Sequence, residues 1–158
     1  MKISIETIIH ATEDVDKILN IISKEFYIDQ KEFSKQSLTG HFNNPIILAR
    51  VKITTDERIN KILFKIISNI SKYEIDYLTK NMHNKIEGTS FYLRLGKQNL
   101  INGIITLNEK DSIKIKISNP KYVNNIEKSY IEMINRLFNQ SRIEKVTRDD
   151  DIKLLQSE

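Results

Sequence analysis

The chain contains no cysteine and no tryptophan, and only four glycines and two prolines among its 158 residues. Without cysteine there can be no disulfide, no thiolate nucleophile and no cysteine-bound zinc. Because glycine and proline are scarce and no repeat is present, nothing marks a linker between domains. We therefore expect one α+β domain over residues 1–140, followed by an acidic tail or a short docked segment over residues 141–158.

Long apolar runs are also missing. None approaches the roughly 20 residues that a membrane-spanning helix needs, and the start of the chain lacks the apolar region and cleavage site of a secretory leader. These absences predict a cytoplasmic protein with no membrane partner.

The residue patterns of common catalytic and cofactor sites are absent as well. The isolated glycines do not form a phosphate-binding loop. His10, His41 and His83 lie in different predicted elements, without the spacing that places two metal ligands on one helix face. Adjacent carboxylates lie only at predicted helix starts or in the tail. We therefore expect no catalytic residues, no metal site and no cofactor, and a protein that is not an enzyme.

Positive charge is concentrated in the middle of the chain. The net charge is +4, and residues 50–97 alone carry 10 basic against 5 acidic side chains, or +5. An excess of this kind attracts polyanions such as RNA. The alternative is the ordinary solvated surface of a lysine-rich protein.

Hydrophobic periodicity predicts strands and helices in alternation. Alternating apolar residues indicate strands at 2–11, 33–38, 46–54, 89–95, 102–108 and 112–118, and helical spacing indicates helices at 13–26, 55–70, 71–87 and 121–139. Thr12 and Thr55 are the expected N-caps of the first two helices, and Pro120 is expected to end the last strand. One apolar face on each element favours a two-layer α+β sandwich, in which a mixed or antiparallel sheet of about five or six strands carries helices on one face.

The other face of this sheet is the candidate binding surface. If the inward isoleucines face the helices, three strands present basic and aromatic residues to solvent: Arg50, Lys52, Tyr92, Arg94, Lys114 and Lys116. Lysine and arginine contact backbone phosphates, and a tyrosine stacks on an unpaired base. The alternative is that outward lysines only keep an open sheet face soluble.

Two short motifs resemble an archaeal family of small proteins that are described as RNA-binding and as predicted exosome subunits. GHFNNPI, at residues 40–46, is similar to the family's GHxGNPI turn, and YLRLGKQ, at residues 92–98, is similar to its LRLDKQ strand end. Asn43 replaces the family's glycine and Gly96 replaces its aspartate. The resemblance implies a fold like that of the ribosomal protein that holds 5S RNA, and it marks two loops: Gly40, His41, Asn44 and Pro45 in one, and Arg94, Lys97 and Gln98 in the other. We expect Arg94, Lys97 and Gln98 to bind RNA together with the other residues of the sheet face.

The function that this resemblance implies is RNA binding without catalysis, in RNA processing or degradation with the exosome, or in ribosome assembly. The expected partners are RNA of unspecified sequence and an RNA-processing complex. The alternative is a protein interaction module or self-associating subunit with no RNA role. The sequence leaves the oligomeric state open, a dimer included.

Overall fold

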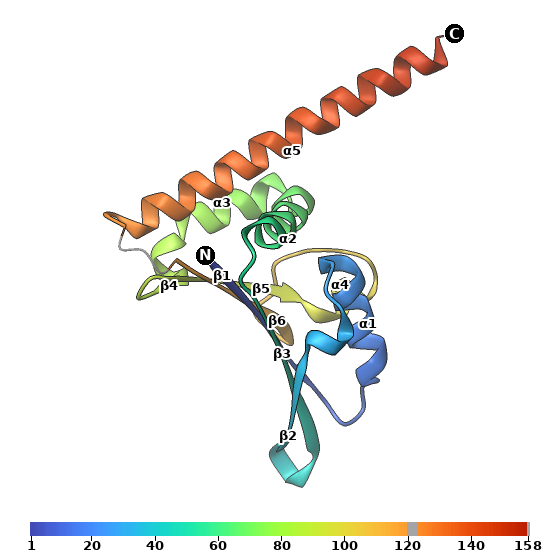
Figure 1. Cartoon of the computed structure of the whole chain (residues 1–158), viewed down its shortest axis with the longest axis vertical. Coiled ribbons are helices and arrows are strands. Elements are labelled where there is room, and N and C mark those ends of the chain that lie inside the picture. The colour runs from blue at the N-terminus through green and yellow to red at the C-terminus, as the bar shows by residue number, and fades with distance from the viewer. Residues whose placement is uncertain (120–122, 158) are drawn as a thin grey trace.

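A computed structural model, which describes residues 1–119 and 123–157, shows one sheet of six strands with all helices on one of its faces (Figure 1). The strands are β1 (Lys2–Ile9), β2 (Ser34–Thr39), β3 (Pro45–Ile53), β4 (Ile86–Glu87), β5 (Ser90–Gly96) and β6 (Ser112–Ser118). They lie in the order β2-β3-β1-β6-β5-β4, and every neighbouring pair is antiparallel. This arrangement confirms the predicted two-layer α+β fold.

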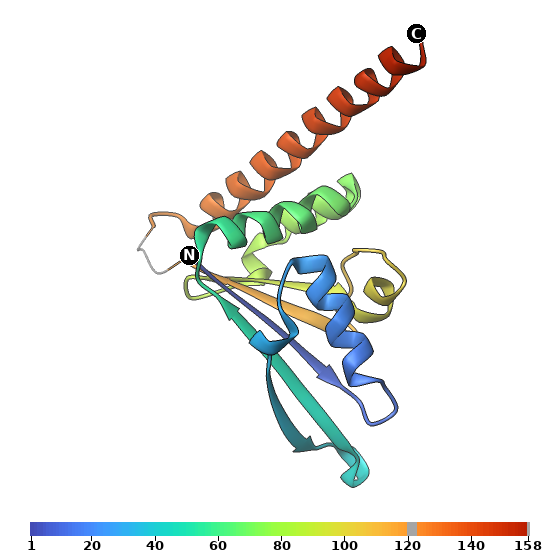
Figure 2. The same cartoon turned by 45° about the vertical axis from the view of Figure 1, so that its right-hand side comes forward.

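Five α-helices cover one face of the sheet, and the opposite face carries no helix (Figures 1 and 2). They are α1 (Val15–Phe26), α2 (Asp56–Asn69), α3 (Lys72–Lys80), α4 (Lys97–Ile101) and α5 (Ile126–Gln156), with short 3-10 turns at η1 (Gln30–Glu32), η2 (His41–Asn43) and η3 (Met82–Lys85). No helix in the described part of the chain is long and apolar enough to cross a membrane.

The core fills the space between these two layers. Alternate residues of the central strands, among them Ile5, Val51 and Ile115, are at most 2% exposed and meet the apolar stripes of the helices, such as Ile66 of α2 and Ile134 of α5. Because side chains alternate along a strand, burying these residues turns their neighbours toward the helix-free face.

Two predicted elements are wrong. The expected helix over 71–87 ends at Lys80, because Asn81 leaves helical geometry and its side-chain amide donates to the Tyr77 carbonyl at 2.8 Å. A 3-10 turn and β4 follow. Residues 102–108 form a loop with one isolated bridge, Leu95 to Leu107, in place of a strand. The side chain of Glu74 accepts hydrogen bonds from Thr106 and from the Leu107 amide, so this loop is held by a helix side chain.

The helix boundaries also differ from expectation. Asp14, two residues after the predicted cap Thr12, caps α1 by accepting from the Lys17 amide at 3.1 Å, and Thr55 precedes α2 without a side-chain capping bond. The last helix begins at Ile126 and continues to Gln156, so the segment after Gln140 is helical rather than a loose tail. The predicted strand stop at Pro120 and helix start at Lys121 lie outside the described residues.

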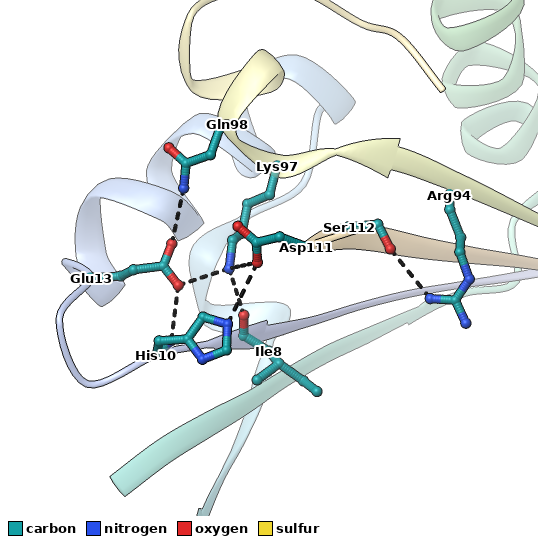
Figure 3. Close-up of polar contacts among 8 residues, drawn as sticks. All are labelled: Ile8, His10, Glu13, Arg94, Lys97, Gln98, Asp111 and Ser112. Carbon is teal, nitrogen blue, oxygen red and sulfur yellow. Dashed lines mark hydrogen bonds and ion pairs between the residues drawn. The ribbon is translucent and has the colours of Figure 1, made fainter. Parts of the chain in front are cut away.

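A buried lysine fastens one end of the sheet. The side chain of Lys97 is 1% exposed, and its ammonium lies 2.8 Å from each of three acceptors: the Ile8 carbonyl, Glu13 Oε1 and Asp111 Oδ1 (Figure 3). These groups come from the end of β1, the turn before α1 and the turn before β6. Because an ammonium has three N–H donors, this lysine is fully hydrogen-bonded.

We expect Lys97→Met to destabilise the fold by about 3 kcal/mol, since it leaves the Glu13 and Asp111 carboxylates without their cation. This value is at the low end for a broken buried ion pair, because Asp111 is partly exposed. Urea unfolding measures the loss. Lys17→Met, at an exposed position on α1, is the control and should change stability by less than about 0.5 kcal/mol. Equal effects of the two variants would refute a special role for Lys97.

The same variant should show a pH signature. Partial burial acts to raise the pKa of Asp111, but the hydrogen bond and charge of Lys97, with smaller contributions from Gln98 and His10, bring the pKa below its usual value. A carboxyl whose pKa is lowered by folding stabilises the folded state at pH values above its unfolded-state pKa. This contribution is lost as the pH falls through its folded-state pKa. The cost of Lys97→Met should therefore be smaller at about pH 3 than at about pH 7.

Candidate nucleic-acid interface

The strand order brings the six basic and aromatic residues of the predicted surface together on the helix-free face. The register aligns them in two cross-strand rows over β5, β6, β1 and β3. The first row reads Arg94, Lys114, Glu6, Arg50, and the second reads Tyr92, Lys116, Ser4, Lys52. We call these two rows the basic face.

Part of the basic face is hollowed. A depression of about 560 Å³ is lined by residues of both rows and by Lys2 at the start of β1. With Lys2 included, the surface carries six cations, against Glu6 within the rows and Glu109 beside Arg94. The face therefore keeps an excess of positive charge over its centre.

The cations of the basic face differ in how far they are paired. Arg50 donates to Glu6 at 2.7 Å, and Arg94 lies 3.5 Å from Glu109. Arg94 also donates to the Ser112 hydroxyl at 3.3 Å (Figure 3). Within the described part of the chain, the lysines of the face, Lys52, Lys114 and Lys116, have no carboxylate within ion-pair distance. These lysines are free to bind an anion.

Tyr92 lies among these lysines. The ammonium groups of Lys114 and Lys116 are 4.9 and 5.6 Å from the centroid of its ring. Such cation–π contacts hold the lysine side chains over the centre of the sheet. The tyrosine therefore positions two cations and also offers an aromatic surface of its own.

Lys97 and Gln98 do not lie on the basic face. Lys97 is buried in the cluster described above, and the Gln98 amide donates to Glu13 at 3.3 Å (Figure 3). His10, Glu13 and Asp111 are close enough to one another to suggest a metal site. The Lys97 ammonium, 2.8 Å from each of the two carboxylates, already supplies the cation at this place. The described residues thus give this cluster a structural role.

The other predicted loop lies at the tip of the β2–β3 hairpin, away from α4 (Figures 1 and 2). There the Gly40 amide donates to the Asn44 carbonyl at 2.8 Å, His41 begins the η2 turn and Pro45 begins β3. Asn43, which replaces the family's glycine, has φ of 59°. Asparagine tolerates this left-handed conformation better than most residues, so the substitution preserves the turn.

Gly96, the other departure from the family motif, occupies the N-cap of α4 with an ordinary φ of −65°. A Cβ atom at this position would lie 2.1 Å from Oδ1 of Asn99. The Asn99 amide therefore fills the space that the aspartate side chain would need, and no side chain caps this helix.

Sequence reasoning left Lys2, Ser4 and Glu6 out of the site. Their outward alternation in β1 is visible in the sequence, but it does not show that β1 lies between β3 and β6. Only that strand order makes them the centre of the basic face.

Comparison with known proteins identifies a family for this chain. A family model described as RNA binding matches residues 2–119. "RNA-binding protein PAB1135" of Pyrococcus abyssi is 32% identical over 121 residues, which cover 73% of this chain and 79% of that protein. "Uncharacterized protein MJ0213" of Methanocaldococcus jannaschii is 32% identical over 133 residues, which cover 75% and 87%.

A solved structure shows the same fold. Protein SSO0741 from Sulfolobus solfataricus matches with a TM-score of 0.70 and 28% identity, over 89% of this chain and 98% of that one. The family model covers all six strands and thus the whole basic face. The chain belongs to the RNA-binding family that this model describes.

Proposed function

We propose that this protein binds RNA through the basic face and acts without catalysis. It serves as an accessory protein in RNA processing or degradation, in association with the exosome, or in ribosome assembly. One observation carries the proposal: three unpaired lysines, Lys52, Lys114 and Lys116, lie together on a helix-free sheet face in a chain of an RNA-binding family. The face provides rigidly spaced cations for phosphates, and backbone contacts of this kind supply most of the affinity of such complexes.

The position of the lysines argues against a role in solubility alone. Outward lysines discourage aggregation when they lie on an edge strand. Here the edge strands are β2 and β4, whereas Lys114 and Lys116 belong to β6, between β1 and β5. A cluster of cations over the centre of a sheet repels itself, so a polyanion bound there relieves this repulsion.

The non-catalytic part of the proposal is supported by how the carboxylates are used. Glu6 is held by Arg50, and Glu13 and Asp111 are held by Lys97. The pKa of Glu74 is lowered, because hydrogen bonds from Thr106, Ser71 and the Leu107 amide outweigh its desolvation. A general base must be free to accept a proton from a substrate, whereas these four carboxylates are held by partners within the chain.

We expect binding of a labelled RNA hairpin to weaken steeply as the salt concentration rises. If each lysine contacts one phosphate, the double variant Lys52→Ala with Lys116→Ala should reduce the slope of log K against log salt by about 1.4 to 1.8. Fluorescence anisotropy at several salt concentrations measures both. The matched control, Lys17→Ala with Lys24→Ala, removes the same charge from the opposite layer. Equal losses of RNA affinity in the two double variants would show that only net charge matters. No binding of RNA at low salt would refute the proposal.

A second candidate function, self-association, is favoured by the free end of α5. This helix extends well beyond the body of the protein (Figures 1 and 2), and residues 145–157 are all exposed. The exposed part carries Ile143, Val146, Ile152, Leu154 and Leu155, each at least 51% exposed. A helix of this length gains little stability in water without packing.

The charges of this segment fit a second copy of the chain. Residues 142–148 carry three basic side chains and one acidic, or +2, whereas residues 149–157 carry three acidic side chains and one basic, or −2. Two such helices that run antiparallel place each basic part against the acidic part of the other. A two-fold symmetric contact has this self-complementary form.

If the protein self-associates in this way, Leu154→Ser with Leu155→Ser should convert a concentration-dependent dimer to a monomer, because these residues lose the apolar contact. Sedimentation equilibrium measures the mass. Phe42→Ser, at the 93% exposed tip of the β2–β3 hairpin, is the control and should leave the dimer intact. A wild-type monomer at all concentrations would exclude this second candidate and leave the RNA proposal untouched.

A further inference from the structure

Two exposed tyrosines lie side by side on α3, outside the basic face. Tyr73 is 80% exposed and Tyr77 is 45% exposed, and their four-residue spacing places them on the same side of the helix. They line a hollow of about 760 Å³ together with Leu107 and Asn108 of the loop that follows α4. Neighbouring exposed aromatic rings beside a hollow are typical of a ligand-binding surface.

This hollow, the tyrosine hollow, is linked to the basic face by a series of neighbouring depressions. The depression on the basic face and a second one of about 250 Å³ share Tyr92 and Lys114 in their walls. That second depression in turn shares Glu109 with the tyrosine hollow. We call this series of neighbouring depressions, from the centre of the sheet past β5 and the loop before β6 to the two tyrosines, the path.

The chemistry of the walls changes along this path. The depressions at its start contain the lysines and arginines of the basic face, and Lys85 follows next to Glu109. Among the described residues that line the tyrosine hollow, none is a lysine or an arginine. Phosphate is therefore attracted to the start of the path, whereas its end offers aromatic rings and hydrogen-bonding groups.

The wall of the tyrosine hollow is preformed. The Glu74 carboxylate accepts from the Ser71 amide at 2.7 Å and from the Leu107 amide at 2.8 Å, which fixes the loop against α3. Asn108 is exposed and lines the hollow, and its side-chain oxygen accepts from the Lys110 amide at 3.0 Å. Side-chain amides and carboxylates bind the polar edges of nucleobases, and the tyrosine rings bind their flat faces.

We propose that the tyrosine hollow binds an unpaired nucleotide of the same RNA whose backbone lies on the basic face, with the base stacked on Tyr73 or Tyr77. This inference rests on the proposed RNA binding. The ligand class is therefore RNA in which a structured segment continues into unpaired nucleotides. The basic face binds the backbone without regard to sequence, and the tyrosine hollow selects for an unpaired base.

The test compares two labelled RNA hairpins that differ only in a short unpaired extension, made in separate versions at the 5′ and 3′ ends. Wild-type protein should bind one of the extended hairpins more tightly than the blunt one. Tyr73→Ala with Tyr77→Ala should remove this advantage, about 5- to 160-fold for a stacked base, and leave the affinity for the blunt hairpin unchanged. Tyr73→Phe with Tyr77→Phe, which keeps the rings, should retain most of the advantage.

Tyr27→Ala is the matched control, because Tyr27 is 47% exposed at the end of α1 and lies outside the path. Circular dichroism and the thermal midpoint establish that each variant is folded. Equal wild-type affinity for blunt and extended hairpins would overturn this inference while leaving RNA binding by the basic face intact. An equal loss for both hairpins in the double alanine variant would also overturn it. Failure of wild-type protein to bind any of the RNAs at low salt would instead overturn the proposed function.

Discussion

The architecture depends on the antiparallel register that joins β1 to β3 on one side and to β6 on the other. In this register Ile5 is paired with Val51 and Ile115, so the buried residues of three strands lie opposite one another. The same register aligns Ser4 with Lys52 and Lys116 on the other face. A slip of one residue would expose the core and bury the cations. The strong preference for burying isoleucine therefore also determines where the charges of the basic face lie.

The register alone does not hold the end of the sheet where β1 runs into α1 and β5 runs into α4. There the chain uses a buried ammonium, and the placement of Lys97 explains why a lysine follows the strand in this motif. Its three acceptors come from parts of the chain that hydrophobic burial would not bring together in one geometry. Removal of the ammonium leaves two carboxylates and a carbonyl without their shared partner, so the cluster specifies the geometry of this corner.

What could be predicted from the sequence was mainly local. Alternation and helical spacing identified β1, β3, β5 and β6 and the apolar faces of the long helices, because each pattern is repeated over several residues. The grouping of Arg50, Lys52, Tyr92, Arg94, Lys114 and Lys116 on one face was also predictable. It needed only the assumption that all inward residues face the same layer.

The errors came from interactions between distant residues. Lysine is rarely buried, so Lys97 was placed on the surface; its carboxylate partner Glu13 is 84 residues away in sequence. Residues 102–108 alternate like a strand, but Glu74, more than 30 residues earlier, holds their backbone in a loop. The place of β1 within the sheet is likewise a property of topology. Lys97 and Gln98 thus belong to a cluster at the end of the sheet rather than to the basic face.

The two departures from the family motif show which property of each loop the chain preserves. At position 43 the backbone needs a left-handed conformation, and asparagine provides it where glycine stood. At position 96 the backbone has no such need, and the Asn99 amide occupies the space of the missing aspartate side chain. Each of the two residues is therefore compatible with the backbone conformation of its loop in this chain. Because the cations of the basic face lie on the strands, the surface that carries the RNA proposal does not depend on either substituted residue.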